Sequence, residues 1–109
     1  RGLSVPFEEV GEVAFNGRAC FVAPVPGEQH SFGASVVASF LRRAGWDVDA
    51  ALSASPASIS AAMRAKSYDL VGFSLSCDRL LDSLASTIEA VRRTSRNRMV
   101  KVIVGGRYF

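Results

Sequence analysis

The sequence predicts a single α/β domain built on a doubly wound parallel sheet, for three reasons. The chain has 109 residues, of which 49% are hydrophobic and 21% charged, as is typical of one small globular domain with one core. Short apolar runs alternate with segments in which apolar residues recur at helical spacing. The connections between these segments are short. This alternation favours a parallel sheet that is covered by helices on both faces.

Residues 1–17 are expected to form a linker end with an extra antiparallel edge strand. The dipeptide Asn16-Gly17 lies between two apolar runs. Because Asn and Gly both tolerate positive φ, this pair is a strong hairpin signal. The domain proper is then expected to span residues 18–109.

The first strand is predicted over residues 18–25 and the first helix over residues 32–44, with Gly45 ending that helix. The apolar residues of this helix recur at helical spacing, so we expect them to share one buried face. That face comprises Phe32, Val36, Val37, Phe40, Leu41 and Ala44.

The rest of the chain repeats the pattern. Ser55 can cap a helix whose first turn holds Pro56. A later run is apolar on both faces, as a buried parallel strand must be. The predicted elements are a strand over 46–52, a helix over 55–66, a strand over 70–75, a helix over 78–94 and a strand over 99–104.

This order of elements limits the topology. Parallel crossovers are right-handed, which leaves few arrangements, and the flavodoxin-like strand order 2-1-3-4 is the expected one. A fifth strand and a last helix normally follow in such folds, and we expect this chain to lack them. In this topology the loops after each strand gather at one edge of the sheet, where ligands bind.

Charge and cysteine content restrict the class of protein. The net charge is +3, and the late cations are expected to form a solvated helix end rather than a nucleic-acid surface, because no aromatic residue interleaves them. No apolar run approaches the ~20 residues of a membrane helix. Cys20 and Cys77 fit neither a disulfide framework nor a zinc site. We therefore expect a cytoplasmic protein without direct contact to nucleic acid or membrane.

The sequence lacks the motifs of several functions that are common in this topology. The dinucleotide fingerprint G-x-G-x-x-G and the P-loop are absent, and so is the G-x-S-x-G elbow of hydrolases. A phospho-acceptor domain needs acidic residues after the first and third strands, where this chain has Ala23-Pro24-Val25 and Ser74-Leu75-Ser76. We expect no catalysis by this chain alone.

His30, the only histidine, follows the first strand and precedes the first helix. A neutral imidazole there can bind a metal with one nitrogen while a neighbour fixes the other. A lone histidine can equally have a purely structural role, so the hypothesis depends on its companions. Cys77 is a candidate for a second ligand. The other candidates are small residues at three strand ends that leave room for a ligand: Gly33, Ser74, Ser76, Gly105 and Gly106.

These residues resemble the motifs of the cobalamin-binding domain family. Residues 28–33 match D-x-H-x-x-G with Glu for Asp, residues 74–76 match S-x-L with Ser for Leu, and residues 105–106 match G-G. The resemblance covers residues 18–109. It implies that His30 is the axial metal ligand and that Glu28 orients it. It also implies that Gly33, Ser74, Ser76, Gly105 and Gly106 line the pocket for the nucleotide tail of the corrinoid.

Glu28 and Ser76 depart from the motifs of this family, and the segment before Arg18 is too short for the helical cap that usually covers cobalamin. The sequence looks most similar to a heme-binding variant of the family, the sensor containing heme instead of cobalamin. This variant occurs in AppA-type antirepressors. The resemblance implies a redox- and blue-light-responsive antirepressor of photosynthesis genes that acts on a transcriptional repressor protein. Heme would be bound by His30, and FAD is expected only in a separate light-sensing domain. The alternatives are a cobalamin-binding photoreceptor or carrier and a cofactor-free interaction domain.

Overall fold

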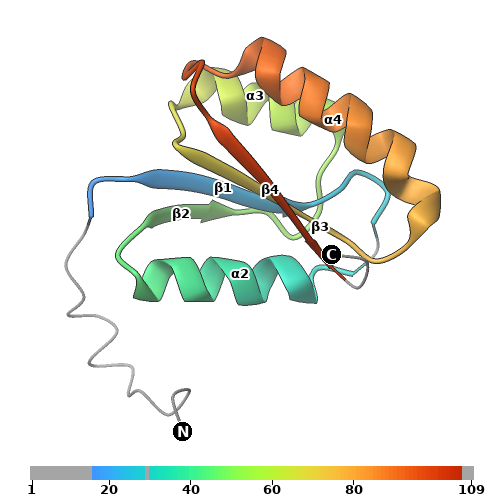
Figure 1. The fold of residues 1–109 in the computed structure, drawn as a ribbon, viewed down its shortest axis with the longest axis horizontal. Coiled ribbons are helices and arrows are strands. Elements are labelled where there is room, and N and C mark those ends of the chain that lie inside the picture. Colours follow the sequence, from blue (N-terminus) through green and yellow to red (C-terminus); the bar gives the residue numbers. More distant parts are fainter. Residues whose placement is uncertain (1–15, 29, 107–109) are drawn as a thin grey trace, which may run out of the picture.

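The computed structural model describes residues 16–28 and 30–106, and its architecture is α/β, as predicted (Figure 1). Its sheet has four parallel strands in the order β2-β1-β3-β4, which confirms the flavodoxin-like order. The edge strand expected before Asn16 lies outside the described residues. The strands are β1 (Ala19–Pro24), β2 (Asp47–Ala50), β3 (Leu70–Leu75) and β4 (Lys101–Gly106).

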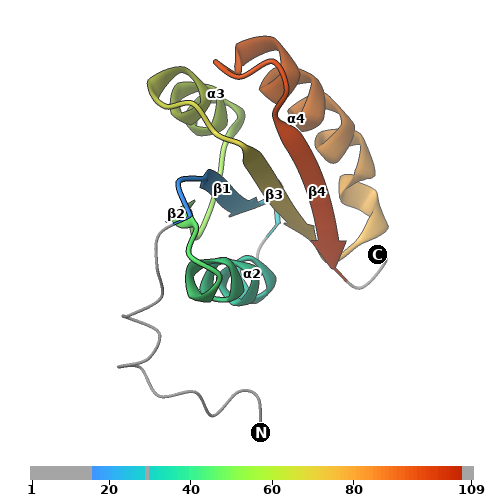
Figure 2. The ribbon, with the colours of Figure 1, turned by 60° about the vertical axis from the view of Figure 1, so that its left-hand side comes forward.

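The helices cover both faces of the sheet, as expected for a doubly wound domain (Figure 2). Helix α2 (Phe32–Arg43) lies on one face, and α3 (Pro56–Ala65) and α4 (Leu81–Thr94) lie on the other. A short 3₁₀ turn, η2 (Asp78–Leu80), precedes α4. None of the helices in this part of the chain is long and apolar enough to cross a membrane.

Local hydrogen bonds explain where two elements begin. Ser55 caps α3 as predicted, because its side chain accepts the Ser58 N–H at 3.1 Å while the Ser58 hydroxyl accepts the Ser55 N–H at 2.9 Å. The last strand begins two residues later than predicted, at Lys101. The Asn97 side chain accepts the Met99 N–H at 2.9 Å, which keeps Met99 out of the strand ladder.

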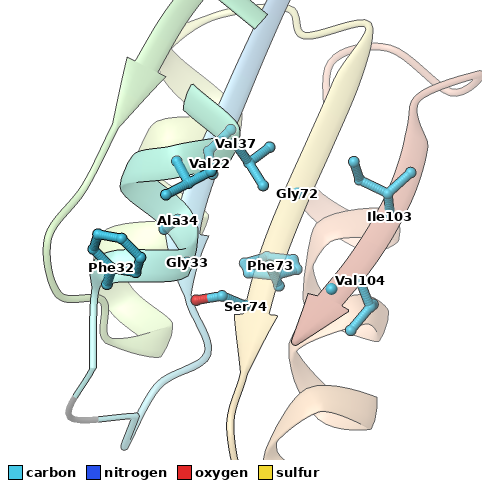
Figure 3. Close-up of a pocket in the computed structure, with 12 residues that line it drawn as sticks. Val22, Phe32, Gly33, Ala34, Val37, Gly72, Phe73, Ser74, Ile103 and Val104 are labelled. Carbon is cyan, nitrogen blue, oxygen red and sulfur yellow. The ribbon is translucent and has the colours of Figure 1, made fainter. Parts of the chain in front are cut away.

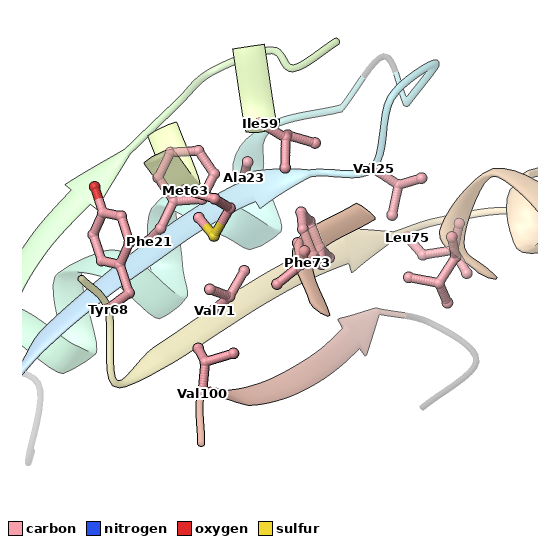
Figure 4. Close-up of a cluster of buried hydrophobic side chains, with 12 residues drawn as sticks. Phe21, Ala23, Val25, Ile59, Met63, Tyr68, Val71, Phe73, Leu75 and Val100 are labelled. Atoms are coloured by element: carbon pink, nitrogen blue, oxygen red, sulfur yellow. The ribbon is translucent and has the colours of Figure 1, made fainter. Parts of the chain in front are cut away.

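Two cores form because successive strand residues point to opposite faces. The larger core lies between the sheet and helices α3 and α4, with Phe21, Val71 and Phe73 near its centre (Figure 4). The smaller core lies under α2 and contains Cys20, Val22, Ala34, Ala38 and Val48. Strands β1 and β3 therefore supply apolar groups to both cores, whereas β2 places Val48 on one face and Asp47 and Asp49 on the other.

The predicted buried face of α2 is wrong in part. Ala34 and Ala38 are 2% and 1% exposed and pack on the sheet, whereas Phe32, Val36 and Phe40 are 78%, 50% and 71% exposed. Helix α2 contacts β1, β2 and β3 through its small residues, which lets it lie close to those strands. Its phenylalanines are consequently directed away from the smaller core and leave an apolar surface beside the sheet.

Candidate functional site

The site begins with a tight turn after β1. The Glu28 N–H donates to the Val25 carbonyl at 2.8 Å, with Pro26 and Gly27 between them. Gly27 has a φ of +93°, and Pro followed by a positive-φ Gly is the signature of a type II turn. The Ser83 hydroxyl of α4 donates to the Pro26 carbonyl at 3.0 Å and so ties the turn to the helix. The turn directs Glu28 back toward the end of β3.

The Glu28 side chain is 2% exposed, yet its carboxylate is well satisfied. Its Oε1 accepts the Ser76 N–H at 2.7 Å, and its Oε2 accepts the Ser76 hydroxyl at 2.6 Å and the His30 N–H at 3.1 Å. Burial alone raises the pKa of this group. The hydrogen bonds from Ser76 and His30 outweigh that effect and lower the pKa of Glu28 to about 2. The carboxylate is therefore ionised at neutral pH.

The same carboxylate fixes the imidazole of His30. Nδ1 lies 3.0 Å from Glu28 Oε2, and an ionised carboxylate can only accept a hydrogen bond, so Nδ1 carries the proton and donates it. The lone pair of the neutral ring is then on Nε2. The side chain is 77% exposed, which leaves Nε2 free to bind a metal. One imidazole suits a metal whose equatorial ligands come from a macrocycle.

An apolar groove of about 330 Å³ lies beside the hydrogen-bonded pair of Glu28 and His30, between α2 and the adjoining face of β3 and β4 (Figure 3). Helix α2 forms one wall with Phe32, Val36 and Val37, and β4 forms the other with Ile103. Its lining is almost entirely apolar, and the polar side chain that it includes is that of Ser74. A groove of this kind suits a flat apolar group with few polar atoms.

Small residues shape the groove. A Cβ added to Gly33 would lie 3.4 Å from the Ser74 Cβ, so glycine allows the start of α2 to approach β3. A Cβ added to Gly105 would meet no atom within 4 Å, so this position opens into free space. The Ser74 Oγ points toward α2, is buried, and has no hydrogen-bond partner among the described residues (Figure 3). A buried hydroxyl without a hydrogen-bond partner destabilises the fold by about 1–3 kcal/mol. A hydrogen-bond acceptor on a ligand could offset this penalty.

A hollow of about 240 Å³ connects the two parts of the site. It is lined by Glu28 and His30 on one side and by Phe32, Gly33 and Ser74 on the other. The histidine and the groove therefore form one continuous surface at the carboxyl ends of β1, β3 and β4.

The structure thus brings together most of the residues singled out from the sequence. Ser76 joins Glu28 and His30 in one hydrogen-bonded unit, and Gly33, Ser74 and Gly105 line the groove. Gly106 ends β4 opposite Leu75 in the register. Cys77 lines a separate hollow of about 280 Å³ that also includes His30, Glu28 and Arg79. The residues that the structure describes contain no cluster of three or more His, Cys, Asp or Glu side chains that could hold a metal ion.

Sequence reasoning missed two features of the site. Ser76 was expected only to line the pocket, and the structure shows that it also holds the Glu28 carboxylate through its backbone N–H and its hydroxyl. The groove surface of Ile103 and Gly72 was also missed. The Pro26-Gly27 pair was an available signal for the contact between Glu28 and Ser76, because a type II turn there returns Glu28 toward the sheet.

Comparison with known proteins agrees with this geometry. The family described as B12 binding domain matches residues 18–109. No curated protein matches the sequence. The match spans the sheet, the three helices and every candidate site residue, from Glu28 to Gly106. The chain therefore belongs to the B12-binding domain family.

Proposed function

We propose that this domain binds a cobalamin, with His30 as the axial ligand of the cobalt. The observation that carries the proposal is the Glu28–His30 pair, in which a buried carboxylate fixes Nδ1 and leaves Nε2 exposed next to an apolar groove. Bound cobalt would supply an open coordination position for that nitrogen. The family membership supports the same cofactor.

We also propose that the groove receives the nucleotide tail of the cobalamin. The tail ends in a flat heteroaromatic base, and the groove offers apolar walls and the buried Ser74 hydroxyl as a donor. Gly33 and Gly105 keep the entrance free of side chains. Burial of a flat group against such walls contributes about 25 cal/mol per Å² of apolar surface.

Heme is the competing cofactor, because an exposed imidazole beside a hollow could also bind heme iron. Heme has no nucleotide tail, so it would use His30 but not Ser74 or Gly105. The sensory role, the repressor partner and the cytoplasmic location are narrower proposals. The first two are supported by the resemblance of the sequence to the antirepressor variant, and the location is supported by the cysteine content. We propose no catalytic role for the domain alone.

Titration with hydroxocobalamin, cobinamide and hemin separates these proposals. We expect cobalamin to co-elute with the protein in gel filtration and to show the spectrum of imidazole-bound cobalt. His30→Ala should lose that spectrum, and Gly105→Val should weaken cobalamin binding but not cobinamide binding. Ser39→Ala, at an exposed serine of α2, is the matched control. A Soret shift with hemin that depends on His30, together with cobalamin that elutes separately, would establish heme instead.

A further inference from the structure

Most cations of the described chain lie at the edge of the sheet opposite the candidate site. The carboxyl edge, where the candidate site lies, includes the carboxylates of Glu28, Asp78 and Asp82 and the guanidinium of Arg79. The opposite edge receives the ends of all three helices, and their last turns hold Arg42, Arg43, Arg64, Arg92 and Arg93. Cations at helix ends are accounted for by the helix dipole. These five therefore need no partner to explain them.

A second group of cations at this edge has no such explanation. Arg18 precedes β1, Arg96 and Arg98 lie in the loop after α4, and Lys101 begins β4. All four are exposed. In the described part of the chain, ion pairs within 4.0 Å involve Lys66 and His30 but none of these four side chains.

Two of these cations line a hollow of about 560 Å³. Its lining comprises Arg18, Trp46, Asp69, Leu70, Asn97, Met99 and Lys101. Arg96 and Arg98 are not part of this lining, but they are the chain neighbours of Asn97 and Met99, which are. Met99 is 81% exposed although it is a large apolar side chain. Trp, Met and Arg are the residue types enriched at the cores of protein interfaces. The hollow thus offers an apolar anchor point inside a cationic rim.

The details favour a protein over a nucleic acid. Trp46 packs against the smaller core, and the Arg18 guanidinium lies 5.8 Å from the centre of its ring, so the indole is already engaged and unsuited to stacking bases. Asp69 also lines the hollow, and its carboxylate is already engaged by the Ala19 N–H at 2.9 Å.

We propose that this basic edge, defined as Arg18, Trp46, Arg96, Arg98, Met99 and Lys101, docks an acidic segment of a partner protein. The segment would place one apolar side chain against Trp46 and Met99 and its carboxylates against the surrounding cations. Charge complementarity of this kind gives specificity and fast association. Since the surface lies at the edge opposite His30, a partner could bind without covering the candidate cofactor site.

The test uses a labelled peptide with one central Leu flanked by Glu residues, and its Gln counterpart as control. We expect the Glu peptide to bind and the affinity to fall with rising salt. The double variant R96E/R98E should weaken binding about tenfold. Met99→Ser should weaken it several-fold without loss of stability, because the side chain is exposed. R64E/R93E, which changes the net charge by the same amount at two exposed arginines outside the hollow, is the matched control and should have a much smaller effect.

Three results would overturn the proposal. The first is an equal loss for R64E/R93E and R96E/R98E, which would indicate charge attraction without a defined site. The second is tighter binding of an oligo-dT probe than of the Glu peptide. The third is absence of peptide binding both by the starting protein and by a variant with Glu8, Glu9 and Glu12 changed to Gln. Binding gained in that variant would support the proposal, because the chain's own carboxylates would then be the competing occupant.

Discussion

The carboxylate of Glu28 accepts hydrogen bonds from both the backbone N–H and the Nδ1 of His30, at 3.1 and 3.0 Å. One buried anion thus sets both the path of the chain and the orientation of the ring. Ser76 holds the same anion from the end of β3. The metal-binding capacity of the imidazole therefore depends on a contact between the loop after β1 and the end of β3.

We expect Glu28→Gln to destabilise the domain by about 1–3 kcal/mol, because the amide places donors against the N–H and O–H donors that surround it. The same change should weaken axial ligation by His30, since the ring loses its strongest acceptor. Urea denaturation and the cobalamin spectrum measure the two effects. Glu89→Gln, at an exposed glutamate of α4, is the matched control and should change neither.

Stability should depend on pH through Glu28. Its pKa in the folded state is about 2, against an ordinary value of 4.5, so its contribution is fully present above pH 4.5 and lost as the pH falls toward 2. The contribution is on the order of 3 kcal/mol. The difference in unfolding free energy between the starting protein and Glu28→Gln should shrink over that interval. A difference that stays constant down to pH 2 would contradict the role of the carboxylate.

Ser74→Ala should have opposite effects on stability and binding. Removal of a buried hydroxyl that has no partner in the described structure should stabilise the ligand-free domain by about 1 kcal/mol. Cobalamin should bind more weakly, while cobinamide, which lacks the nucleotide tail, should bind as before. Thermal unfolding and the two titrations test this. If the variant is less stable, the hydroxyl has a partner within the protein.

Two glycines should respond differently to the same substitution. Gly27 has a φ of +93°, and an added Cβ would lie 3.1 Å from the Leu80 Cδ2, so Gly27→Ala should cost about 1–2 kcal/mol or more. Gly105→Ala should leave stability nearly unchanged, because its Cβ meets nothing within 4 Å. Urea midpoints of the two variants measure the contrast. Equal losses would show that the turn after β1 is not under this constraint.

The two cysteines should differ in reactivity. Burial, with a smaller contribution from the charge of Asp49, raises the pKa of Cys20 to about 11, so little thiolate forms at pH 8. Cys77 is partly exposed beside His30. A thiol reagent should modify Cys77 rapidly in the native protein and Cys20 only after unfolding. Cys77→Ser should remove the rapid phase, and its persistence would contradict the assignment.

The sequence predicted the strand order and most of the candidate site because both depend on local signals. Alternating strand and helix patterns determine a parallel sheet, and the carboxyl ends of its strands then bring Glu28, His30 and Ser74 to one edge. The orientation of α2 was not predictable in the same way. Its alanines and its phenylalanines both recur at helical spacing, and only packing against the sheet determines that Ala34 and Ala38 face inward.

The contacts of Ser76 also escaped prediction, because they join residues 48 positions apart in the chain. A sequence pattern gives the residue type at each position. The Pro26-Gly27 pair indicates a turn after β1, but it does not indicate that Ser76 is the residue that Glu28 meets at the end of β3. The tautomer of His30 depends on its hydrogen bond to the same Glu28 carboxylate, so it could not be predicted from the sequence either.

The open space at Gly105 bears on how this domain could change over generations. The fold places no demand on that position, whereas the turn at Gly27 cannot accept another residue without strain. A lineage that stopped using the groove would therefore accumulate side chains at position 105 while keeping glycine at position 27. The residue at position 105 in descendants of this domain would then indicate whether the groove is still under selection for its ligand.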